Sequence, residues 1–336
     1  MIRGETICRS FESRVLEGNP QGDPWIRDVW IHLPPGYDAL ESCPVLFVLT
    51  GFTGRGRMAL NDSPWAPGLD RRADRLLASG RSEACILVFP DCFTRLGGSQ
   101  YLNSTALGRY EDYVVTELVP WVDREFRTLG DGHRGVLGKS SGGYGALRLA
   151  MRNPGTFAAL ASHSGDVCFE LCYEPDFPAV ARTLAKEGGI DAFLESFARG
   201  EKKRPEQIQA LNILAMSAAY SPGLGAAFEL PFDLHDVSLR SEVWQRWLAH
   251  DPLQMVEEPE YQTALRGMKL VYVDAGTKDQ FNLEFGARRL AKRLDALGIR
   301  HVYEEFEDDH FSISYRYERS LPLLTRALSE RQSGGL

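Results

Sequence analysis

The stretch that most constrains the fold is residues 138–142, which read Gly-Lys-Ser-Ser-Gly and match the pattern G-x-S-x-G. The apolar pair before it, residues 136–137, has the character of the end of a buried strand, and the apolar residues from Leu147 onward have helical spacing. A strand, a tight turn and a helix are the context that a nucleophile elbow requires. The helix would direct free N–H groups and the positive end of its dipole at the serine. We therefore predict that Ser140 is an activated nucleophile.

Two other interpretations of this stretch are a Gly/Ser-rich connecting turn and a phosphate-binding loop. The phosphate pattern G-x-x-x-x-G-K-[ST] is not met, because no Gly-Lys-Ser/Thr in the chain has a second glycine at the required offset. The strand-like and helix-like segments on either side favour the elbow over a plain turn.

Composition is that of an ordinary globular chain, with 43% hydrophobic and 25% charged residues among 336. A net charge of −8 argues against nucleic acid or an anionic membrane as a partner. No apolar run approaches the roughly 18 residues that span a bilayer. The N-terminus carries charge without a following apolar stretch, so we expect no secretory signal. The six cysteines form no C-x-x-C pair, which favours a reducing cytoplasm.

Buried-strand patterns alternate with helical patterns through most of the chain. This alternation predicts an α/β fold with a mainly parallel central sheet and helices on both faces. Ligands of such sheets bind at the carboxyl ends of the strands. Two alternating segments near the N-terminus, residues 12–17 and 28–33, predict an antiparallel pair. The buried strands are expected at residues 44–49, 85–89, 134–137, 157–162, 269–275 and 301–306, and the main helices at 69–77, 110–126 and 282–297.

The alternation stops between residues 167 and 265, where no buried-strand run occurs. Since a structureless stretch of that length is improbable, we expect several helices there. We divide the chain into a core of residues 1–166 and 266–336 and a helical cap or lid over 167–265. An aromatic stripe at helical spacing includes Trp244 and is expected to pack in the core of the cap and also to wall an apolar pocket.

A serine nucleophile needs a base and a group that orients the base. Of the seven histidines, His310 follows the last predicted strand, where a loop at the sheet edge could place an imidazole over Ser140. His163 is the competitor at the same edge, and we expect it to line the pocket instead. For the orienting acid we prefer Asp279, in the loop after the preceding strand, over Asp274 within the strand and Glu284 in the next helix. The order Ser140, Asp279, His310 is that of α/β-hydrolases.

An oxyanion requires two fixed N–H donors. We expect one to be the backbone N–H of Ser141, the residue after the nucleophile, and the other the N–H of Phe52 in the Gly-bearing loop after the first buried strand. The polar loop over residues 94–105 falls at the same sheet edge, and we expect Tyr101 and Asn103 to line the substrate pocket.

Several of these segments together carry a family resemblance. They are residues 46–52 (Leu-Phe-Val-Leu-Thr-Gly-Phe), 89–91 (Phe-Pro-Asp), 138–146 around Ser140, 276–279 (Gly-Thr-Lys-Asp) and the terminal His310. In these the chain resembles the putative-esterase family of α/β-hydrolases, which includes enterochelin esterases, S-formylglutathione hydrolases (esterase D) and mycolyltransferases. The resemblance covers roughly residues 25–165 and 265–330. It implies a serine esterase that works through an acyl-enzyme with no metal and no other cofactor.

The chain also departs from the resemblance. Many relatives carry His before the nucleophile and Met or Leu after it, where this chain has Lys139 and Ser141. The helical insertion is larger than in S-formylglutathione hydrolases.

The predicted activity is hydrolysis of small-molecule carboxylic esters by the triad Ser140, His310 and Asp279. The alternatives are a thioesterase of the S-formylglutathione hydrolase type, an acyltransferase, and a non-catalytic binding protein on a hydrolase scaffold. The sequence leaves the acyl chain, the alcohol and homo-oligomerisation open.

Overall fold

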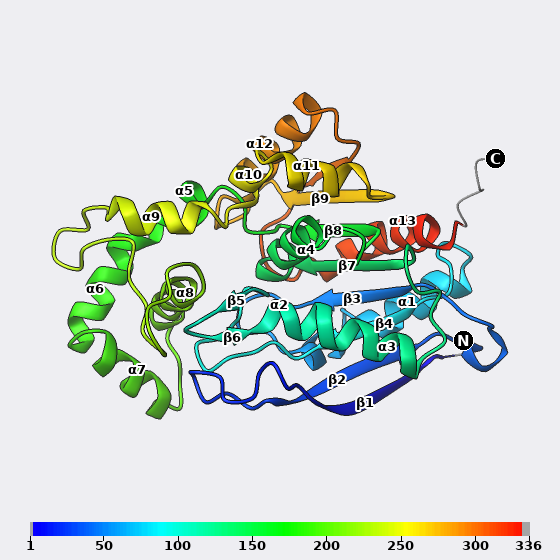
Figure 1. Cartoon of the computed structure of the whole chain (residues 1–336), viewed down its shortest axis with the longest axis horizontal. Coiled ribbons are helices and arrows are strands. Elements are labelled where there is room, and N and C mark those ends of the chain that lie inside the picture. Colours follow the sequence, from blue (N-terminus) through cyan, green and yellow to red (C-terminus); the bar gives the residue numbers. More distant parts are fainter. Residues whose placement is uncertain (1–2, 331–336) are drawn as a thin grey trace.

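The computed structural model describes residues 3–330, and its main sheet has eight strands in the order β1-β2-β4-β3-β7-β8-β9-β10 (Figure 1). From β4 to β10 neighbouring strands are parallel, whereas β1 and β2 pair antiparallel to each other and β2 to β4. The predicted mainly parallel sheet is confirmed. The strands are β1 Glu5–Glu12, β2 Ile26–Leu33, β3 Val45–Leu49, β4 Ile86–Pro90, β7 Arg134–Lys139, β8 Ala159–His163, β9 Leu270–Gly276 and β10 Val302–Phe306, with β5 Asn103–Ser104 and β6 Gly108–Arg109 in a separate small ribbon.

The first strand was predicted too late in the chain. It covers Glu5–Glu12 rather than residues 12–17, although its antiparallel pairing with β2 is as predicted. As an edge strand β1 buries little of either face, so a two-residue hydrophobic period hardly marks it. Residues 13–17 form turns instead, and the Glu117 carboxylate holds them by accepting hydrogen bonds from Ser13 Oγ and the Val15 N–H.

Helices cover both faces of the sheet, because the buried strands present apolar side chains alternately to each side. On β3, Leu46 and Val48 pack toward α1 and α13, while Phe47 packs toward the helices on the other face. The helices on one face are α1 Leu69–Ala78 and α13 Tyr317–Ser329, and on the other α2 Tyr110–Asp112, α3 Val119–Glu125, α4 Ser141–Arg152 and α12 Leu283–Ala296. A π-helical segment, Tyr113–Leu118, joins α2 to α3, so the predicted helix over residues 110–126 is continuous.

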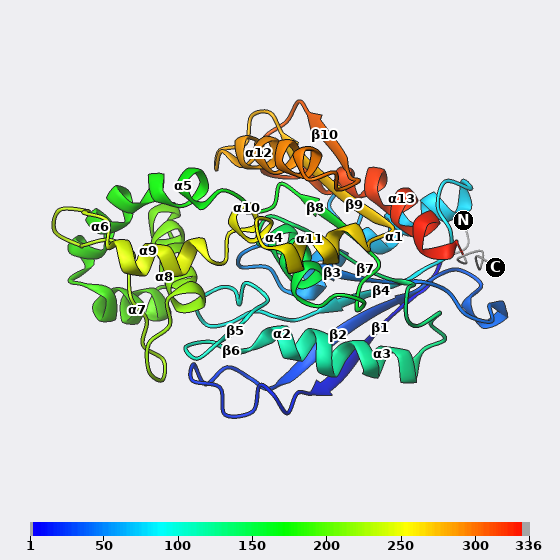
Figure 2. The same cartoon turned by 45° about the horizontal axis from the view of Figure 1, so that its top comes forward.

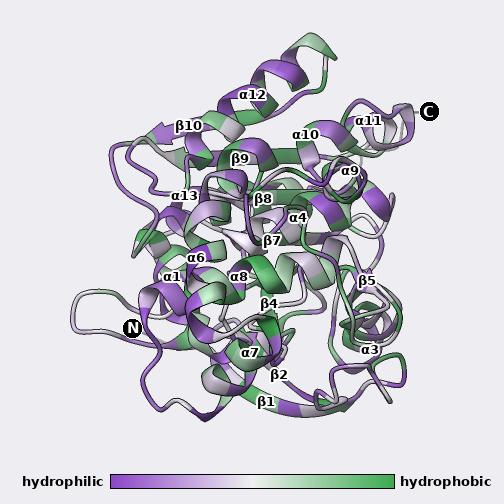
Figure 3. Ribbon diagram, turned by 90° about the vertical axis from the view of Figure 1, so that its left-hand side faces the viewer, coloured by the Kyte–Doolittle hydropathy of each residue, from purple (hydrophilic) through white to green (hydrophobic). Residues whose placement is uncertain are grey.

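The predicted insertion contains helices, and most of them project beyond the edge of the sheet (Figures 1 and 2). Viewed from that side, α8 lies centrally, and α6 packs against both α8 and α7 (Figure 3). The last two helices, α10 and α11, pack instead against α4 and α12, so they cover the sheet rather than project from it. The helices are α5 Phe169–Cys172, α6 Phe177–Glu187, α7 Ile190–Arg199, α8 Pro205–Tyr220, α9 Ser241–Leu248, α10 Pro252–Met255 and α11 Pro259–Arg266.

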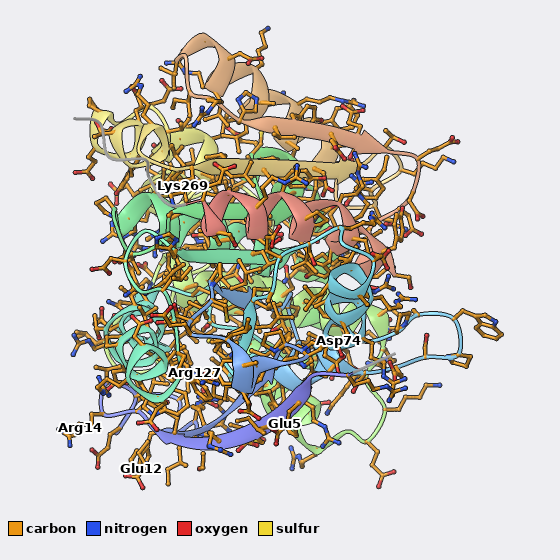
Figure 4. The ribbon with its side chains drawn as sticks, turned by 90° about the vertical axis from the view of Figure 1, so that its right-hand side faces the viewer. Glu5, Glu12, Arg14, Asp74, Arg127 and Lys269 are labelled. Atoms are coloured by element: carbon orange, nitrogen blue, oxygen red, sulfur yellow. The ribbon has the colours of Figure 1, made fainter. Side chains whose placement is uncertain are left out.

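At the end of the molecule opposite the projecting helices, Asp74 on α1 is the centre of a set of hydrogen bonds (Figure 4). Its carboxylate accepts a hydrogen bond from the N–H of Gly4 at 2.9 Å and lies 2.9 Å from Nε2 of His32 on β2. One buried side chain thus ties the N-terminal strands to α1. Within the described residues, no helix has the length and apolar character needed to cross a membrane.

A buried ion pair links α2 and α4 where they cover the same face of the sheet. Glu111 Oε2 accepts a hydrogen bond from Arg148 at 2.6 Å, and Oε1 accepts from Arg152 at 3.3 Å and from Asn153 at 3.1 Å. Burial alone would raise the pKa of Glu111, but the two arginines and Asn153 outweigh it and hold this pKa below its usual value.

Replacing Glu111 with Gln should lower the free energy of unfolding at pH 7 by about 3–5 kcal/mol, because Arg148 stays buried without its anion. The folded-state pKa is depressed, so the stabilisation is present above the unfolded pKa and lost as the pH falls through the folded one. The difference between wild type and Glu111→Gln in urea titrations should therefore shrink below about pH 4. Glu195→Gln, which breaks an exposed pair with Arg199, should cost under about 0.5 kcal/mol. Equal losses in the two variants would contradict this account.

Candidate active site

The carboxyl ends of the parallel strands bring together residues that are far apart in the sequence. Gly51 follows β3, Ser140 follows β7, Asp166 follows β8, and His310 follows β10. All four line one cavity of about 780 Å³. The cavity therefore lies at the sheet edge where ligands of parallel α/β folds bind.

Ser140 lies at the turn between β7 and α4. Its backbone angles, φ 58° and ψ −130°, fall in a region that residues other than glycine rarely adopt. The turn is held by hydrogen bonds from the Ser140 N–H to the carbonyl of His163 and from the Tyr144 N–H to the carbonyl of Ser140, both at 2.9 Å. Strained backbone of this kind persists only when its surroundings fix it.

Two glycines make this turn sterically allowed. A Cβ on Gly138 would overlap the backbone of Gly142, and a Cβ on Gly142 would overlap the carbonyl of Leu49 at the end of β3. The start of α4 thus presses against both neighbouring strand ends, as the G-x-S-x-G spacing predicts.

Ser140, His310 and Asp279 form a hydrogen-bonded chain. Ser140 Oγ lies 3.0 Å from His310 Nε2, and His310 Nδ1 lies 2.8 Å from Asp279 Oδ2. Both the histidine and the aspartate are buried. With Nδ1 donating to the carboxylate, Nε2 is left as the acceptor for the serine proton. The structure therefore brings together the three side chains that the sequence singled out.

The loops after β9 and β10 hold this geometry through contacts with each other. The N–H of Thr277 donates to the carbonyl of Phe306 at 2.9 Å, and the N–H of His310 donates to Gln280 Oε1 at 2.9 Å. Asp279 Oδ1 accepts from the N–H of Phe281 at 2.9 Å, so both of its oxygens are engaged.

His163 and Asp274 form another histidine–carboxylate pair near the same sheet edge, but it lies within the core. His163 Nδ1 is 2.8 Å from Asp274 Oδ1, and its Nε2 is 2.8 Å from Ser320 Oγ on α13. Asp274 also accepts a hydrogen bond from Arg316 at 2.8 Å. The expectation that His163 lines the pocket is wrong, because its ring points to the α13 face of the sheet. Asp274 is a paired structural carboxylate, as its position within a strand suggested.

The loop after β3 lies directly beside Ser140. A Cβ on Gly51 would stand 3.2 Å from the Cβ of Ser140 and 3.7 Å from its Oγ, so only glycine fits there comfortably. Among residues 3–330 the N–H groups of Phe52 and Ser141 have no hydrogen-bond acceptor. Both are therefore available as donors beside the serine.

Tyr101 supports this loop from behind rather than lining the cavity. Its hydroxyl donates to the carbonyl of Thr50 at 2.6 Å, and the side chain is buried. The predicted place of Tyr101 in the pocket is therefore wrong. Its backbone is in the left-handed region, with φ 52°.

Asn103 and Trp244 also do not line the cavity. Asn103 lies in the β5–β6 ribbon, where its Oδ1 accepts from the N–H of Asp112 at 3.2 Å. Trp244 is buried within the insertion, with ring centroids 5.7 Å from both Phe177 and Trp247. The aromatic stripe thus packs in the core of the insertion, as expected. The expectation that it also lines the pocket is wrong, because α8 and the segment around α5 supply that wall.

The insertion supplies its wall through α8 and through the segment around α5. The sequence does not mark these residues, because the face that α8 turns to the sheet depends on tertiary packing. Asp166 was identifiable, since it follows a predicted strand at the same edge as Ser140. The further lining residues are Cys172, Tyr173, Asp176, Pro205, Glu206, Ile208, Gln209, Asn212, Phe281, Leu283 and Phe311.

Two ionisable side chains in the cavity stand beside the serine without forming an ion pair within 4.0 Å in the described part of the chain. They are Lys139 and Asp166. Burial lowers the pKa of Lys139, opposed chiefly by Asp279. Burial raises the pKa of Asp166, opposed by hydrogen bonds from Tyr173 and Ser141. No cluster of metal-ligating side chains is present over residues 3–330.

Comparisons with known proteins identify a family and a shared fold. A model of the family described as putative esterase matches residues 24–318. Two Mycobacterium tuberculosis proteins, Esterase MT1326 and Esterase Rv1288, are 45% identical over 88 residues, which make up 24% of this chain and 18% of each relative. The chain thus corresponds to less than a fifth of the length of these curated relatives.

Solved structures of hydrolases share the fold. A ferulic acid esterase superposes with a TM-score of 0.62 at 18% identity, covering 98% of this chain and 100% of that one. An S-formylglutathione hydrolase from Agrobacterium tumefaciens gives 0.60 at 17% identity, covering 98% and 97% of the two chains. A fluorophosphonate-binding serine hydrolase from Staphylococcus aureus gives 0.58 at 14% identity, covering 98% and 100%. At such identities the likeness shows the α/β-hydrolase fold.

Replacing Gly142 with Ala should lower the free energy of unfolding by about 2–3 kcal/mol or more, because the new methyl group meets the Leu49 carbonyl. Gly267→Ala is the matched control. At Gly267 φ is −73° and the nearest atom to an added Cβ is 3.4 Å away, so the change should stay within about 0.5 kcal/mol. Chemical denaturation monitored by circular dichroism measures both. If Gly142→Ala were as stable as Gly267→Ala, the elbow would not be the close contact described.

Proposed function

The chain belongs to the putative-esterase family, and we propose that it is a serine carboxylesterase whose nucleophile, base and orienting acid are Ser140, His310 and Asp279. The observation that carries this proposal is the unbroken chain of contacts from Ser140 Oγ to His310 at 3.0 Å and from His310 to Asp279 at 2.8 Å, opening on a cavity. The substrate is a small-molecule carboxylic ester.

Attack begins with the proton on Ser140. His310 Nε2 accepts it as Oγ bonds to the acyl carbon, and the Asp279 carboxylate stabilises the imidazolium that forms. The negative charge on the carbonyl oxygen develops beside the N–H groups of Phe52 and Ser141. Each donor of this kind typically contributes about 3 kcal/mol to lowering the barrier.

Collapse of the tetrahedral intermediate releases the alcohol, which takes the proton from His310 Nε2 and leaves the acyl group on Ser140. A water molecule then gives its proton to His310 and attacks the same carbon. The second intermediate collapses to the carboxylic acid, and Ser140 regains its proton.

The insertion shapes the substrate cavity in this proposal. Its residues at the end of α5, in the turn that follows and on α8 form one wall, and the strand-end loops contribute to the other. About 780 Å³ accommodates a drug-sized ligand. Pro205, Ile208 and Leu283 give part of the lining apolar character, which suits an acyl chain or the carbon skeleton of an alcohol.

Replacing Ser140 with Ala should reduce hydrolysis of p-nitrophenyl acetate, butyrate and octanoate by about a thousandfold or more, because the acyl group has no oxygen to bond to. The chromogenic assay is run on wild type and variant with matching circular dichroism spectra. A folded Ser140→Ala protein with near-wild-type turnover would remove the serine from the mechanism. The preference among the three chain lengths reports the depth of the acyl site.

Two of the buried histidine–carboxylate pairs, His310 with Asp279 and His163 with Asp274, should respond differently to amide substitution. Asp279→Asn should lower kcat by about 10³–10⁴, since the amide stabilises neither the required tautomer nor the imidazolium. Asp274→Asn should instead lower Tm through its loss of charge beside Arg316, with kcat within about tenfold of wild type. A larger loss of kcat in Asp274→Asn would transfer the orienting role to that residue.

A further inference from the structure

Most buried carboxylates of this protein lie within 4.0 Å of a basic side chain. These are Asp74 with His32, Asp91 with Arg55, Glu111 with Arg148, Asp274 with Arg316 and Asp279 with His310. Asp251, Glu284 and Asp166 have no such partner among residues 3–330. Asp251 accepts hydrogen bonds from the N–H groups of Cys168, Phe169 and Leu253, which explains its burial. Glu284 does not line the cavity, whereas Asp166 does.

The partners of Asp166 are all neutral, and all reach the same oxygen. Oδ2 accepts hydrogen bonds from Tyr173 at 2.8 Å, from Ser141 at 3.0 Å and from Gln100 at 3.3 Å. These three donors, which come from α4, the polar loop and the segment after α5, fix the direction of the carboxylate. They supply no positive charge.

The second oxygen, Oδ1, has no donor within the described residues. Oδ1 is not one of the fully buried polar atoms that lack a hydrogen-bond partner, so it keeps some solvent-accessible surface. Because the residue is only 6% exposed and lines the cavity, Oδ1 is the part of Asp166 that is open to the cavity. A carboxylate that is held in place and buried, with one free oxygen facing a ligand site, is suited to binding a cation.

We propose that Asp166 binds a positively charged ammonium group of the substrate, so that the natural ester carries an amine or quaternary ammonium in its acyl or its alcohol part. This rests on the proposed esterase function. Removing a carboxylate from water is costly unless a cation compensates it, and here the substrate supplies that cation. Aromatic side chains of Phe52 and Tyr173 also line the cavity and can face an ammonium group.

The other charges of the cavity are compatible with this assignment. Glu206 is paired with Arg204 at 3.1 Å, and Asp176 accepts a hydrogen bond from Gln209 at 2.7 Å. Lys139 is the lining cation, and its ammonium lies 5.6 Å from the ring centroid of Phe311. Burial lowers the pKa of Lys139, and among the carboxylates that oppose this effect Asp279 has the largest influence, ahead of Asp166. Asp166 is thus the buried anion of the cavity that lacks a close countercharge.

Matched pairs of esters test the proposal, because each pair differs only in charge. For the alcohol part, butyrylcholine is compared with 3,3-dimethylbutyl butyrate. For the acyl part, p-nitrophenyl 4-(trimethylammonio)butyrate is compared with p-nitrophenyl 5,5-dimethylhexanoate. In one of the two series the cationic ester should have a kcat/KM at least about tenfold higher than its neutral isostere. No preference for charge in either series would overturn the proposal.

Asp166→Asn keeps the shape and some of the hydrogen bonding but removes the charge. The ratio of kcat/KM for the cationic over the neutral ester should fall to within about threefold of unity, and any general loss of activity cancels in this ratio. The control is Glu206→Gln, which removes a partly exposed, paired carboxylate of the same cavity and should leave the ratio within about twofold. An unchanged ratio in Asp166→Asn, or an equal collapse in Glu206→Gln, would show that Asp166 is not the cation site.

Binding measured without turnover separates this proposal from the esterase proposal. Calorimetric titration of the Ser140→Ala protein with butyrylcholine and with 3,3-dimethylbutyl butyrate, and likewise with the two p-nitrophenyl esters, needs neither the reaction nor an Asp166 variant. At least tenfold tighter binding of one cationic ester supports the site even if no ester is hydrolysed. Equal affinity within both pairs contradicts it, even if wild type hydrolyses neutral esters.

Discussion

The site depends on the close approach of three backbone segments, the end of β3, the end of β7 and the first turn of α4. Side chains at Gly138 and Gly142 would collide with this backbone, so the approach requires residues without a Cβ. The contact sets the strained conformation of Ser140 and brings the loop after β3 beside its hydroxyl. The Ser140 hydroxyl and the free N–H groups are therefore positioned by one packing constraint.

The remaining groups come to the same place because parallel strands end at a common edge. Asp279 and His310 lie in neighbouring loops that hydrogen-bond to each other, and the sheet holds the base of both. Substrate-facing chemistry is thus carried by loops on a rigid support, which keeps flexible side chains within hydrogen-bond distance of one another.

Much of this was predictable from the sequence, since strand ends and chain order depend on local patterns. Ser140, Asp279 and His310 follow predicted strands, and the structure places them together. The pocket residues were predicted less well. Tyr101 and His163 stand at the correct edge, but packing turns their side chains away from the cavity. The wall formed by α8 could not be predicted from the sequence, because a largely buried helix has no hydrophobic pattern that distinguishes the face toward the pocket.

The cavity wall supplied by α8 and the segment around α5 and the groups at the strand ends are encoded in different stretches of the chain. None of the hydrogen-bonded trio of Ser140, His310 and Asp279 lies between residues 167 and 265, while α8 residues within the range 205–212 line the cavity. Substitutions on α8 can consequently change the cavity wall while the contacts among Ser140, His310 and Asp279 stay intact. Evolution can therefore change the cavity wall through substitutions between residues 167 and 265 without changing the residues at the strand ends.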